Sequence, residues 1–401
     1  MRLKLTLNKS EYYYPVTHVS NNVVYVNPHF KNVFQGLRKD SSSSLALFLD
    51  SSKLIDDSKI LQHNEKYLDS IKNKSVAFST YGLTPGKNAI ISTNHTRSSI
   101  VFKTAFRLSD YSSKHPYPDF VQDVELKGCG YHRAFILNSF LSPKKLLVYG
   151  KESGIQNLKN ANEDLRWTEY LASKGVRVVP HIAHLKLNEL IFEGKQYSIF
   201  QAKFKQLIPT NVTPVLIVRG FGTRNRLQDL SNVLTDSPAI HVDLNMINQT
   251  LDVIKKEYSL KRRLSVQDYS LWFVENLAKQ IKILNLLGFK HFSLTKHQVT
   301  LDCRLLDFAG SEMRSDLPEA SLVALQKSQY KKGYSLVNDF SLSIGKILYR
   351  KLLDNPKSEI DRDFLLKGKK KILNFQNRLL NLYTSKYELT ELPKELNREL
   401  N

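Results

Sequence analysis

Three segments of the chain hold side chains whose types and spacing suit the binding of phosphate. In the first, Lys127 ends an apolar run and is followed by Gly128 and Gly130. An ammonium group beside two glycines can lie close to phosphate oxygens, because glycine lets the backbone approach. Most lysines at the end of a strand are simply solvated, so this segment alone is a weak signal.

The second segment carries three arginines around a turn. An apolar run from Pro214 to Val218 leads into Arg219, and Arg224 and Arg226 follow a stretch that contains two glycines. Each guanidinium can make charge-assisted, bidentate hydrogen bonds to a phosphate. The alternative interpretation is a solvated basic loop.

The third segment ends in an aspartate. The runs Val299–Leu301 and Arg304–Leu306 predict a hairpin with Asp302 and Cys303 at its turn, and Asp307 follows it. A carboxylate that leaves such a strand is where kinase-like folds hold the magnesium ion that bridges nucleotide phosphates.

Apolar periodicity predicts the elements that must position these residues. Short apolar runs bounded by turn residues predict strands, namely Met1–Leu7, Val76–Phe78, Ala89–Ile91, Ile100–Phe102, Val121–Lys127, Phe135–Leu137, Leu146–Val148, Val176–Val179, Leu190–Phe192, Tyr197–Phe200 and Pro214–Arg219. A helix is predicted from Asn160 to Ser173, with Gly175 ending it. Helical spacing predicts three later helices, Val266–Leu287, Leu336–Leu353 and Asp363–Tyr383.

This order of elements divides the chain into four parts. We predict an N-terminal extension (1–74), a β-rich N-lobe with one helix (75–227), a helical C-lobe (228–345) and a helical C-terminal tail (346–401). A strand–helix–strands unit ahead of a helical half is expected of a bilobal kinase-like fold but is not unique to it. The pattern alone therefore predicts a mixed α and β protein with two lobes.

The motifs, taken together and in order, resemble the selenoprotein O family of protein adenylyltransferase pseudokinases. The shared features are the Lys-Gly-x-Gly segment, a helix that ends in Ala-x-x-Gly-Val, the pair Arg219 and Arg226 seven residues apart, and the spacing of His291 and Asp307. The match runs with gaps over 76–310, more than half of the chain. It implies a bilobal α+β protein-kinase-like fold with an N-terminal extension and a helical C-terminal tail.

The resemblance also implies roles for single residues. Lys127 would contact nucleotide phosphates, with Asp164 as its helical carboxylate partner and Glu169 as the runner-up. Arg219 and Arg226 would grip the terminal phosphate of ATP bound in the flipped orientation that this family uses.

The implied metal site departs from the family pattern. Asp307 would bind Mg²⁺, or Mn²⁺ in its place, but His297 and Gln298 stand where the family has Asp-Asn. Gln298 still offers a carbonyl oxygen to the metal, one methylene further out, and His297 could act as a catalytic base near neutral pH. Histidine adds no anionic charge to hold the metal ion. The sequence is therefore consistent both with an altered active site and with one that has lost catalysis.

A second group of proteins departs from the selenoprotein O pattern in a similar way. The segment Ser293–Thr295 and the run Thr300–Phe308 resemble the MchC-like proteins of microcin gene clusters at least as well. That resemblance implies a part in attaching a siderophore to a microcin C-terminus, together with an acyltransferase-like partner.

Composition narrows the class of protein. A hydrophobic fraction of 41% is that of a folded globular chain, and no apolar run approaches the roughly 18–20 residues that span a bilayer. We expect a cytoplasmic location. Cys129 and Cys303 are far apart and are expected to be reduced, structural thiols. His181 and His184 lack a third metal ligand nearby in the sequence, so a structural role is expected for both.

The net charge of +21 suits an anionic partner. The basic residues are dispersed, and the densest clusters, 367–371 and 261–263, are not interleaved with aromatic residues as a stacking platform for nucleic acid requires. A solvated basic face or an acidic partner protein is therefore favoured over nucleic acid.

Two hypotheses follow. In the first, the chain uses ATP and Mg²⁺ to transfer an adenylyl group to hydroxyls of a protein or peptide substrate. In the second, it is a catalytically degenerate relative that serves as partner or scaffold in peptide modification. The residues His297 and Gln298 leave open whether the chain is an enzyme.

Overall fold

The computed structural model describes a large part of the chain, namely residues 11–15, 17–18, 20–30, 79–80, 88–92, 99–129, 155–192, 195–230, 237–314, 317–349 and 359–387. The fold is α+β, as the sequence predicts. The strands predicted over Met1–Leu7, Val76–Phe78, Phe135–Leu137 and Leu146–Val148 lie outside the described residues.

The chain divides into two compact units. The sheet unit consists of Met1–His115, Asp119–Arg166 and Val179–Phe221. The helical unit consists of Pro116–Pro118, Trp167–Val178 and Gly222–Asn401. The chain passes from the first to the second within helix α5 (Leu158–Ser173).

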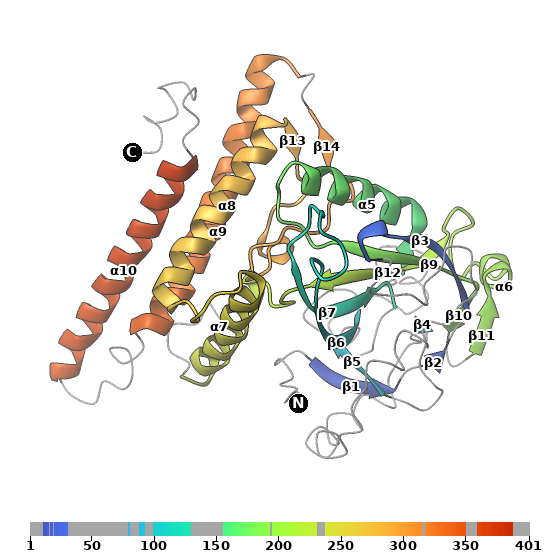
Figure 1. Cartoon of the computed structure of the whole chain (residues 1–401), viewed down its shortest axis with the longest axis horizontal. Coiled ribbons are helices and arrows are strands. Elements are labelled where there is room, and N and C mark those ends of the chain that lie inside the picture. Colours follow the sequence, from blue (N-terminus) through green and yellow to red (C-terminus); the bar gives the residue numbers. More distant parts are fainter. Residues whose placement is uncertain are drawn as a thin grey trace. The chain divides into compact units, whose positions relative to one another are not determined.

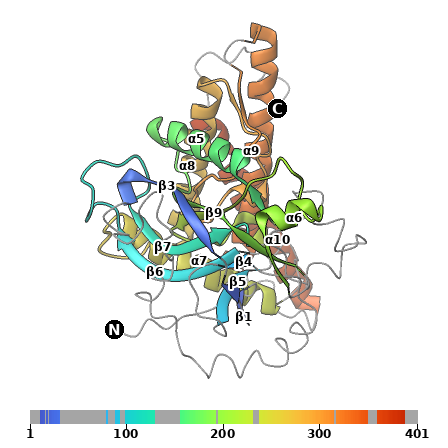
Figure 2. The same ribbon diagram turned by 90° about the vertical axis from the view of Figure 1, so that its right-hand side faces the viewer.

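A curled antiparallel sheet forms the sheet unit (Figures 1 and 2). Its strand order is β1-β5-β6-β7-β12-β9-β3, with β8 paired to β12. The strands are β1 (Glu11–Pro15), β3 (Asn21–Val26), β5 (Asn88–Ser92), β6 (Ser99–Arg107), β7 (Phe120–Lys127), β8 (Gln156–Asn157), β9 (His181–Leu187) and β12 (Pro214–Phe221). Outside this sheet, β2 (Thr17–His18) pairs in parallel with β4 (Ser79–Thr80), and η1 (Pro28–Phe30) is a single 3-10 turn.

Strand β12 lies at the centre of this unit, and all of its residues are buried. Its continuous apolar sequence is typical of a strand covered on both faces, and Pro214 stands at its first position, where a missing N–H is tolerated. Leu158 and Ala161 of α5 pack against Val215 and Ile217 on one of those faces. The predicted strands over β7 and β12 are thus confirmed to within two residues at each end.

Helix α5 is also confirmed, although it begins two residues earlier than predicted. It ends where Gly175 takes a left-handed conformation with φ of 82°, and the Gly175 N–H donates to the Ala172 carbonyl at 2.9 Å. Glycine adopts this conformation without steric cost, which is why it ends the helix.

One strand prediction is wrong at its end. Strand β10 (Glu189–Phe192) pairs with β11 (Lys195–Ser198), and the predicted strand Tyr197–Phe200 stops at Ser198, because helix α6 (Ile199–Phe204) begins there. Ser198 and Gln201 form a capping box, the exchange of side-chain and backbone hydrogen bonds that starts a helix.

The helical unit contains four long helices and short elements between them, within the residues that the structure describes. They are η2 (Leu227–Asp229), α7 (Ser237–Glu257), α8 (Val266–Leu286), β13 (Phe289–Lys290), η3 (Lys296–Gln298), β14 (Glu312–Met313), α9 (Glu319–Tyr349) and α10 (Glu359–Tyr387). Helices α8, α9 and α10 pack alongside one another (Figure 1). The four residues Phe273, Leu277, Ile281 and Leu284 are fully buried on one face of α8, as their spacing predicts.

The strand predicted over Val176–Val179 is wrong. Only Val178 makes a bridge, with Leu305. The Arg177 N–H donates to the Gln280 side chain at 3.0 Å, and the Arg177 carbonyl accepts from the Leu305 N–H at 2.8 Å. The backbone groups of this segment are thus satisfied without a strand ladder.

None of the described helices is both long and apolar enough to cross a bilayer. The two cysteines, Cys129 and Cys303, are free and buried, as predicted.

Candidate functional site

In the helical unit, three of the predicted site residues lie together. The Arg226 Nη1 donates to the His297 carbonyl at 2.7 Å, and it lies 3.8 Å from the Asp307 Oδ2. Arg226 is buried, whereas the Asp307 side chain is 25% exposed. A buried cation, a carbonyl and a partly accessible carboxylate therefore meet at one place, although they come from separate segments.

The hairpin predicted ahead of Asp307 is present in a tight form. Val299 bridges Leu305, and the Cys303 N–H donates to the Thr300 carbonyl at 2.9 Å. Cys303 at the turn and Asp307 after it both have left-handed backbones, with φ of 58° and 64°. This conformation costs free energy in residues other than glycine, and such residues cluster at functional sites.

The segment that carries Arg226 is tied to this hairpin. Arg226 and Thr300 form a bridge, and the Leu227 N–H donates to the Val299 carbonyl at 3.0 Å. The Arg226 N–H donates to the Asp229 carboxylate at 2.7 Å. These contacts fix the backbone at Arg226 and at the residue that follows it.

The short helix η3 holds His297 and Gln298. The Gln298 Oε1, the oxygen that the resemblance assigns to a metal, accepts a hydrogen bond from the Thr295 N–H at 3.1 Å and another from the Thr295 hydroxyl. The His297 side chain is exposed. Partial burial lowers the pKa of His297, and the charge of Arg226 lowers it further. The imidazole is therefore neutral near neutral pH, as a general base must be.

The residues present fit a magnesium ion only through Asp307. Within the described part of the chain, no group of three or more His, Cys, Asp or Glu side chains is arranged to hold a metal ion. Magnesium, however, is often held by one or two carboxylates together with substrate phosphates. Asp307 suits that arrangement, and Gln298 could join it only by releasing Thr295.

In the sheet unit, Lys127 stands at the end of β7, paired in register with Ile217 of β12. The turn after it requires glycine. Gly128 has φ of 104°, and a Cβ there would lie 2.8 Å from the Val215 carbonyl oxygen. Glycine at this position is therefore required by the packing of the turn against β12 and β8.

Asp164 belongs to a chain of buried polar groups that the sequence did not predict. Its Oδ2 lies 3.3 Å from the His181 Nε2, and the His181 Nδ1 lies 2.9 Å from the His184 Nε2. Burial, and secondarily the proximity of His181, lower the pKa of His184 to about 3. Glu169, the runner-up for the role given to Asp164, is exposed on the part of α5 that belongs to the helical unit.

Arg219 is also engaged within the sheet unit. It is 1% exposed, it pairs in register with Glu125 of β7, and its Nη2 lies 3.3 Å from the Glu125 Oε1. Its guanidinium lies 5.4 Å from the centre of the Phe221 ring. A phosphate that bound Arg219 would therefore have to share it with Glu125.

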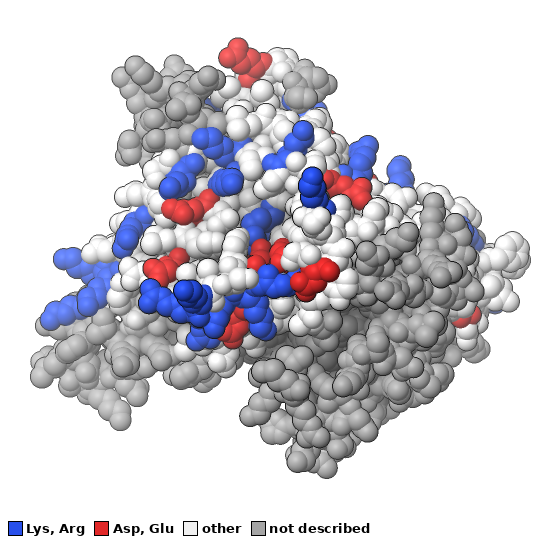
Figure 3. Space-filling view, in the orientation of Figure 1, with Lys and Arg blue, Asp and Glu red and all other residues white. Residues whose placement is uncertain are grey.

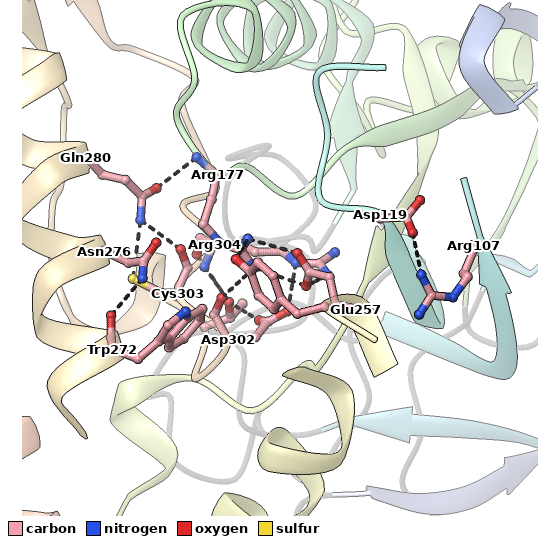
Figure 4. A network of polar contacts seen from close by, with 12 residues as sticks. Arg107, Asp119, Arg177, Glu257, Trp272, Asn276, Gln280, Asp302, Cys303 and Arg304 are labelled. Atoms are coloured by element: carbon pink, nitrogen blue, oxygen red, sulfur yellow. Dashed lines mark hydrogen bonds and ion pairs between the residues drawn. The ribbon is translucent and has the colours of Figure 1, made fainter. Parts of the chain in front are cut away.

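Beneath the hairpin of the helical unit lies a buried network of charges (Figure 4). Arg177 binds both carboxylate oxygens of Glu257, at 2.8 and 3.1 Å. Arg304 lies 3.3 Å from Glu257 and 2.7 Å from the Asp302 carboxylate. Burial raises the pKa of Glu257, but the two guanidiniums outweigh this and hold it below its ordinary value.

The network positions the turn of the hairpin. Arg177 Nη2 donates to the Asp302 carbonyl at 3.3 Å, and Gln280 Nε2 donates to the Cys303 carbonyl at 2.9 Å. A Cβ on Gly222 would fall on the Asp302 carboxylate and on Arg304. The one hint of this in the sequence is Gln280, a polar residue on the apolar face of α8.

The chain matches no family model and no curated protein.

Proposed function

We propose that the chain is a divergent, kinase-like protein of the selenoprotein O type, which binds ATP and magnesium and transfers an adenylyl group to hydroxyls of a protein or peptide. The observation that carries this proposal is that the Arg226 guanidinium lies at both the His297 backbone carbonyl and the Asp307 carboxylate in the helical unit. By the resemblance, Arg226 would bind phosphate, His297 would act as the base and Asp307 would bind the metal ion. Arg226 and His297 are 71 residues apart in sequence, so their meeting is not a consequence of local spacing.

The order of elements supports the same proposal. The sheet unit contains β7, which ends in Lys127, and the first part of α5, and the helical unit holds the later helices. This order is expected of a bilobal kinase-like fold. The left-handed backbone of Asp307 supports it too, since strain of this kind is retained where it serves a site.

In the proposed reaction, the substrate hydroxyl attacks the α-phosphorus of ATP, the new O–P bond forms, and pyrophosphate leaves. The neutral imidazole of His297 accepts the hydroxyl proton. Arg226 supplies positive charge that stabilises the phosphates in the transition state, and the resemblance assigns Lys127 and Arg219 to phosphate binding as well. A magnesium ion held by Asp307 would neutralise phosphate charge when bound.

The alternative function, a catalytically degenerate scaffold in peptide modification, is favoured by a different observation. The Gln298 oxygen is used to cap η3, and Arg219 is paired with Glu125. Two groups that an enzyme would need are thus engaged in contacts within the protein.

Thermal unfolding with and without magnesium and ATP tests the proposal. A ligand at about 100 times its Kd adds roughly 2.7 kcal/mol to the unfolding free energy, which raises the midpoint by several degrees. We expect this shift in the wild type and in the surface control Asp252→Asn. We expect it to be lost in Lys127→Ala and Asp307→Ala.

Transfer is then followed with ATP labelled at the α-phosphate or at the γ-phosphate. Label that reaches protein from the α-position alone, and not in Asp307→Ala, identifies adenylyl transfer. A nucleotide shift without transfer, together with partner binding that survives Asp307→Ala, would favour the scaffold. The absence of any nucleotide shift would contradict nucleotide binding itself.

A further inference from the structure

Helix α6 displays two aromatic side chains to solvent. Phe200 and Phe204 are 79% and 81% exposed, the highest values among the exposed large apolar residues of the described chain. Four residues apart, they lie on one face of the helix. Ala202, on the opposite face, is fully buried. The helix therefore buries its small residue and presents its large ones.

Helix α6, which carries these two rings, is held in place by hydrogen bonds at its start. The Gln201 N–H donates to the Ser198 hydroxyl at 3.1 Å, and the Ser198 N–H donates to the Gln201 side chain at 3.0 Å. The Ile199 N–H donates to the Asn188 carbonyl at 3.0 Å. Helix α6 also lies against the β10–β11 hairpin (Figure 1). The two phenylalanines are thus held outward by a capped helix fixed to its neighbours.

Single exposed apolar residues are normal on a protein surface, whereas larger contiguous apolar patches mark sites of interaction. Two largely exposed rings on one helix face are candidates for such a patch. Each Phe side chain gains free energy when it leaves water, in proportion to the apolar area that is buried. The free protein forgoes most of this gain at both positions. An apolar environment that receives both rings is therefore expected to bind α6.

Two lysines accompany the rings on this segment, and Glu189 stands in register with Ser198 at the start of the helix. Lys203 is half-buried beside them, and Lys205 is exposed, with its Nζ 5.9 Å from the centre of the Tyr197 ring. No aspartate or glutamate occurs in the sequence from 194 to 228. The binding partner must therefore combine an apolar interior with negative charge at its surface.

We propose that Phe200, Phe204, Lys203 and Lys205, here called the α6 face, bind the surface of an anionic lipid bilayer. The rings would enter the interface, and the lysine ammonium groups would lie against the headgroup phosphates. A bilayer suits side chains that project from a helix of six residues, because it receives them without a shape-matched pocket.

The rest of the chain is compatible with such a surface. Lys and Arg side chains are spread over the visible described face, with Asp and Glu among them (Figure 3), and the net charge is +21. A charge of this sign draws the protein toward anionic membranes. The proposal does not depend on nucleotide binding, since the α6 face holds none of the residues assigned to ATP.

Co-sedimentation of the full chain with vesicles tests the proposal. One set of vesicles is pure phosphatidylcholine, and the other contains about one third phosphatidylserine. We expect binding to the anionic vesicles and little to the neutral ones. The double variant Phe200→Ser, Phe204→Ser should bind the anionic vesicles about tenfold more weakly or worse. Its thermal midpoint should stay near that of the wild type, since both rings are exposed.

The matched control is Phe292→Ser, which removes a ring that is 64% exposed in the helical unit and should leave vesicle binding unchanged. A second variant, Lys203→Glu with Lys205→Glu, should weaken the preference for phosphatidylserine while both rings are kept. The proposal is overturned if the wild type does not bind anionic vesicles, which would leave the α6 face to a protein partner. It is overturned as well if the phenylalanine double variant binds like the wild type.

Discussion

His184, buried beside His181 and Asp164, is expected to make the stability of this protein depend on pH. The three are connected by contacts of 3.3 and 2.9 Å inside the sheet unit. The ring of Tyr25 lies 5.2 Å from that of His184. Burial keeps the His184 imidazole neutral, because a charge there would be poorly solvated.

The first prediction concerns the pH dependence of stability. His184 has an ordinary pKa of 6.5 when unfolded and about 3 when folded. As the pH falls below 6.5, the unfolded chain takes up a proton at this site that the folded chain refuses. The unfolding free energy should therefore decrease, by up to roughly 1.4 kcal/mol per pH unit. In His184→Gln this part of the slope should vanish.

Urea unfolding at a series of pH values from about 8 to about 5 measures that slope. An unchanged slope in His184→Gln would mean that His184 takes up a proton as readily in the folded chain as in the unfolded chain.

At the scale of elements, buried charge connects segments that are distant in the sequence. Glu257 at the end of α7 binds Arg177, which follows α5, and Arg304 of the hairpin. Removing one partner of a buried ion pair leaves an uncompensated charge, whose cost exceeds the worth of an exposed pair.

We therefore predict that Glu257→Gln lowers the unfolding free energy by about 3 kcal/mol or more, because Arg177 and the buried Arg304 both lose the carboxylate of Glu257. Asp252→Asn on the same helix is the control. It removes the ion pair with Arg263, whose members are 54% and 43% exposed, and should cost less than about 0.5 kcal/mol. Chemical denaturation of the three proteins makes the comparison. Equal losses in the two variants would contradict the buried network.

The packing of α9 on its neighbouring helices leads to a second prediction at this scale. A Cβ on Gly333 would fall on the Tyr383 hydroxyl and on the Ile281 side chain. Gly333→Ala should destabilise the protein by about 1–3 kcal/mol, even though alanine favours a helix by about 1 kcal/mol.

The control for this change is Ser335→Ala, at an exposed position of the same helix, which should be neutral or slightly stabilising. Thermal midpoints of the two variants decide the question. A higher midpoint for Gly333→Ala would mean that α9 and α10 are not in contact at this residue.

At the scale of the whole molecule, the excess of 21 positive charges favours anionic ligands of any kind. Its effect is long-range and weakly specific, so it steers association without choosing the partner. Which partner binds depends on local geometry. In the helical unit that geometry is Arg226 beside Asp307, and in the sheet unit it is the two exposed rings of α6.

Much of the local structure could be predicted from residue order. The extents of β7, β12, α5 and α8 follow from apolar spacing and from the terminating Gly175, because these signals act within a few residues. The error at 197–200 has a local cause, because the Ser198–Gln201 capping box is present in the sequence and outweighs strand propensity. The error at 176–179 does not, because Arg177 in that segment bonds to the distant residues Gln280 and Leu305. The helix predicted from Leu336 begins much earlier, at Glu319.

Residue order and composition alone therefore determine the periodic elements, the caps, the net charge and the candidate phosphate-binding residues. The folded chain decides the partners of buried charge, such as Glu257 for Arg177 and His181 for Asp164. It also decides that Phe200 and Phe204 face water. The reason is physical: burial and ion pairing depend on what lies within a few ångströms in space, and here those neighbours come from distant segments.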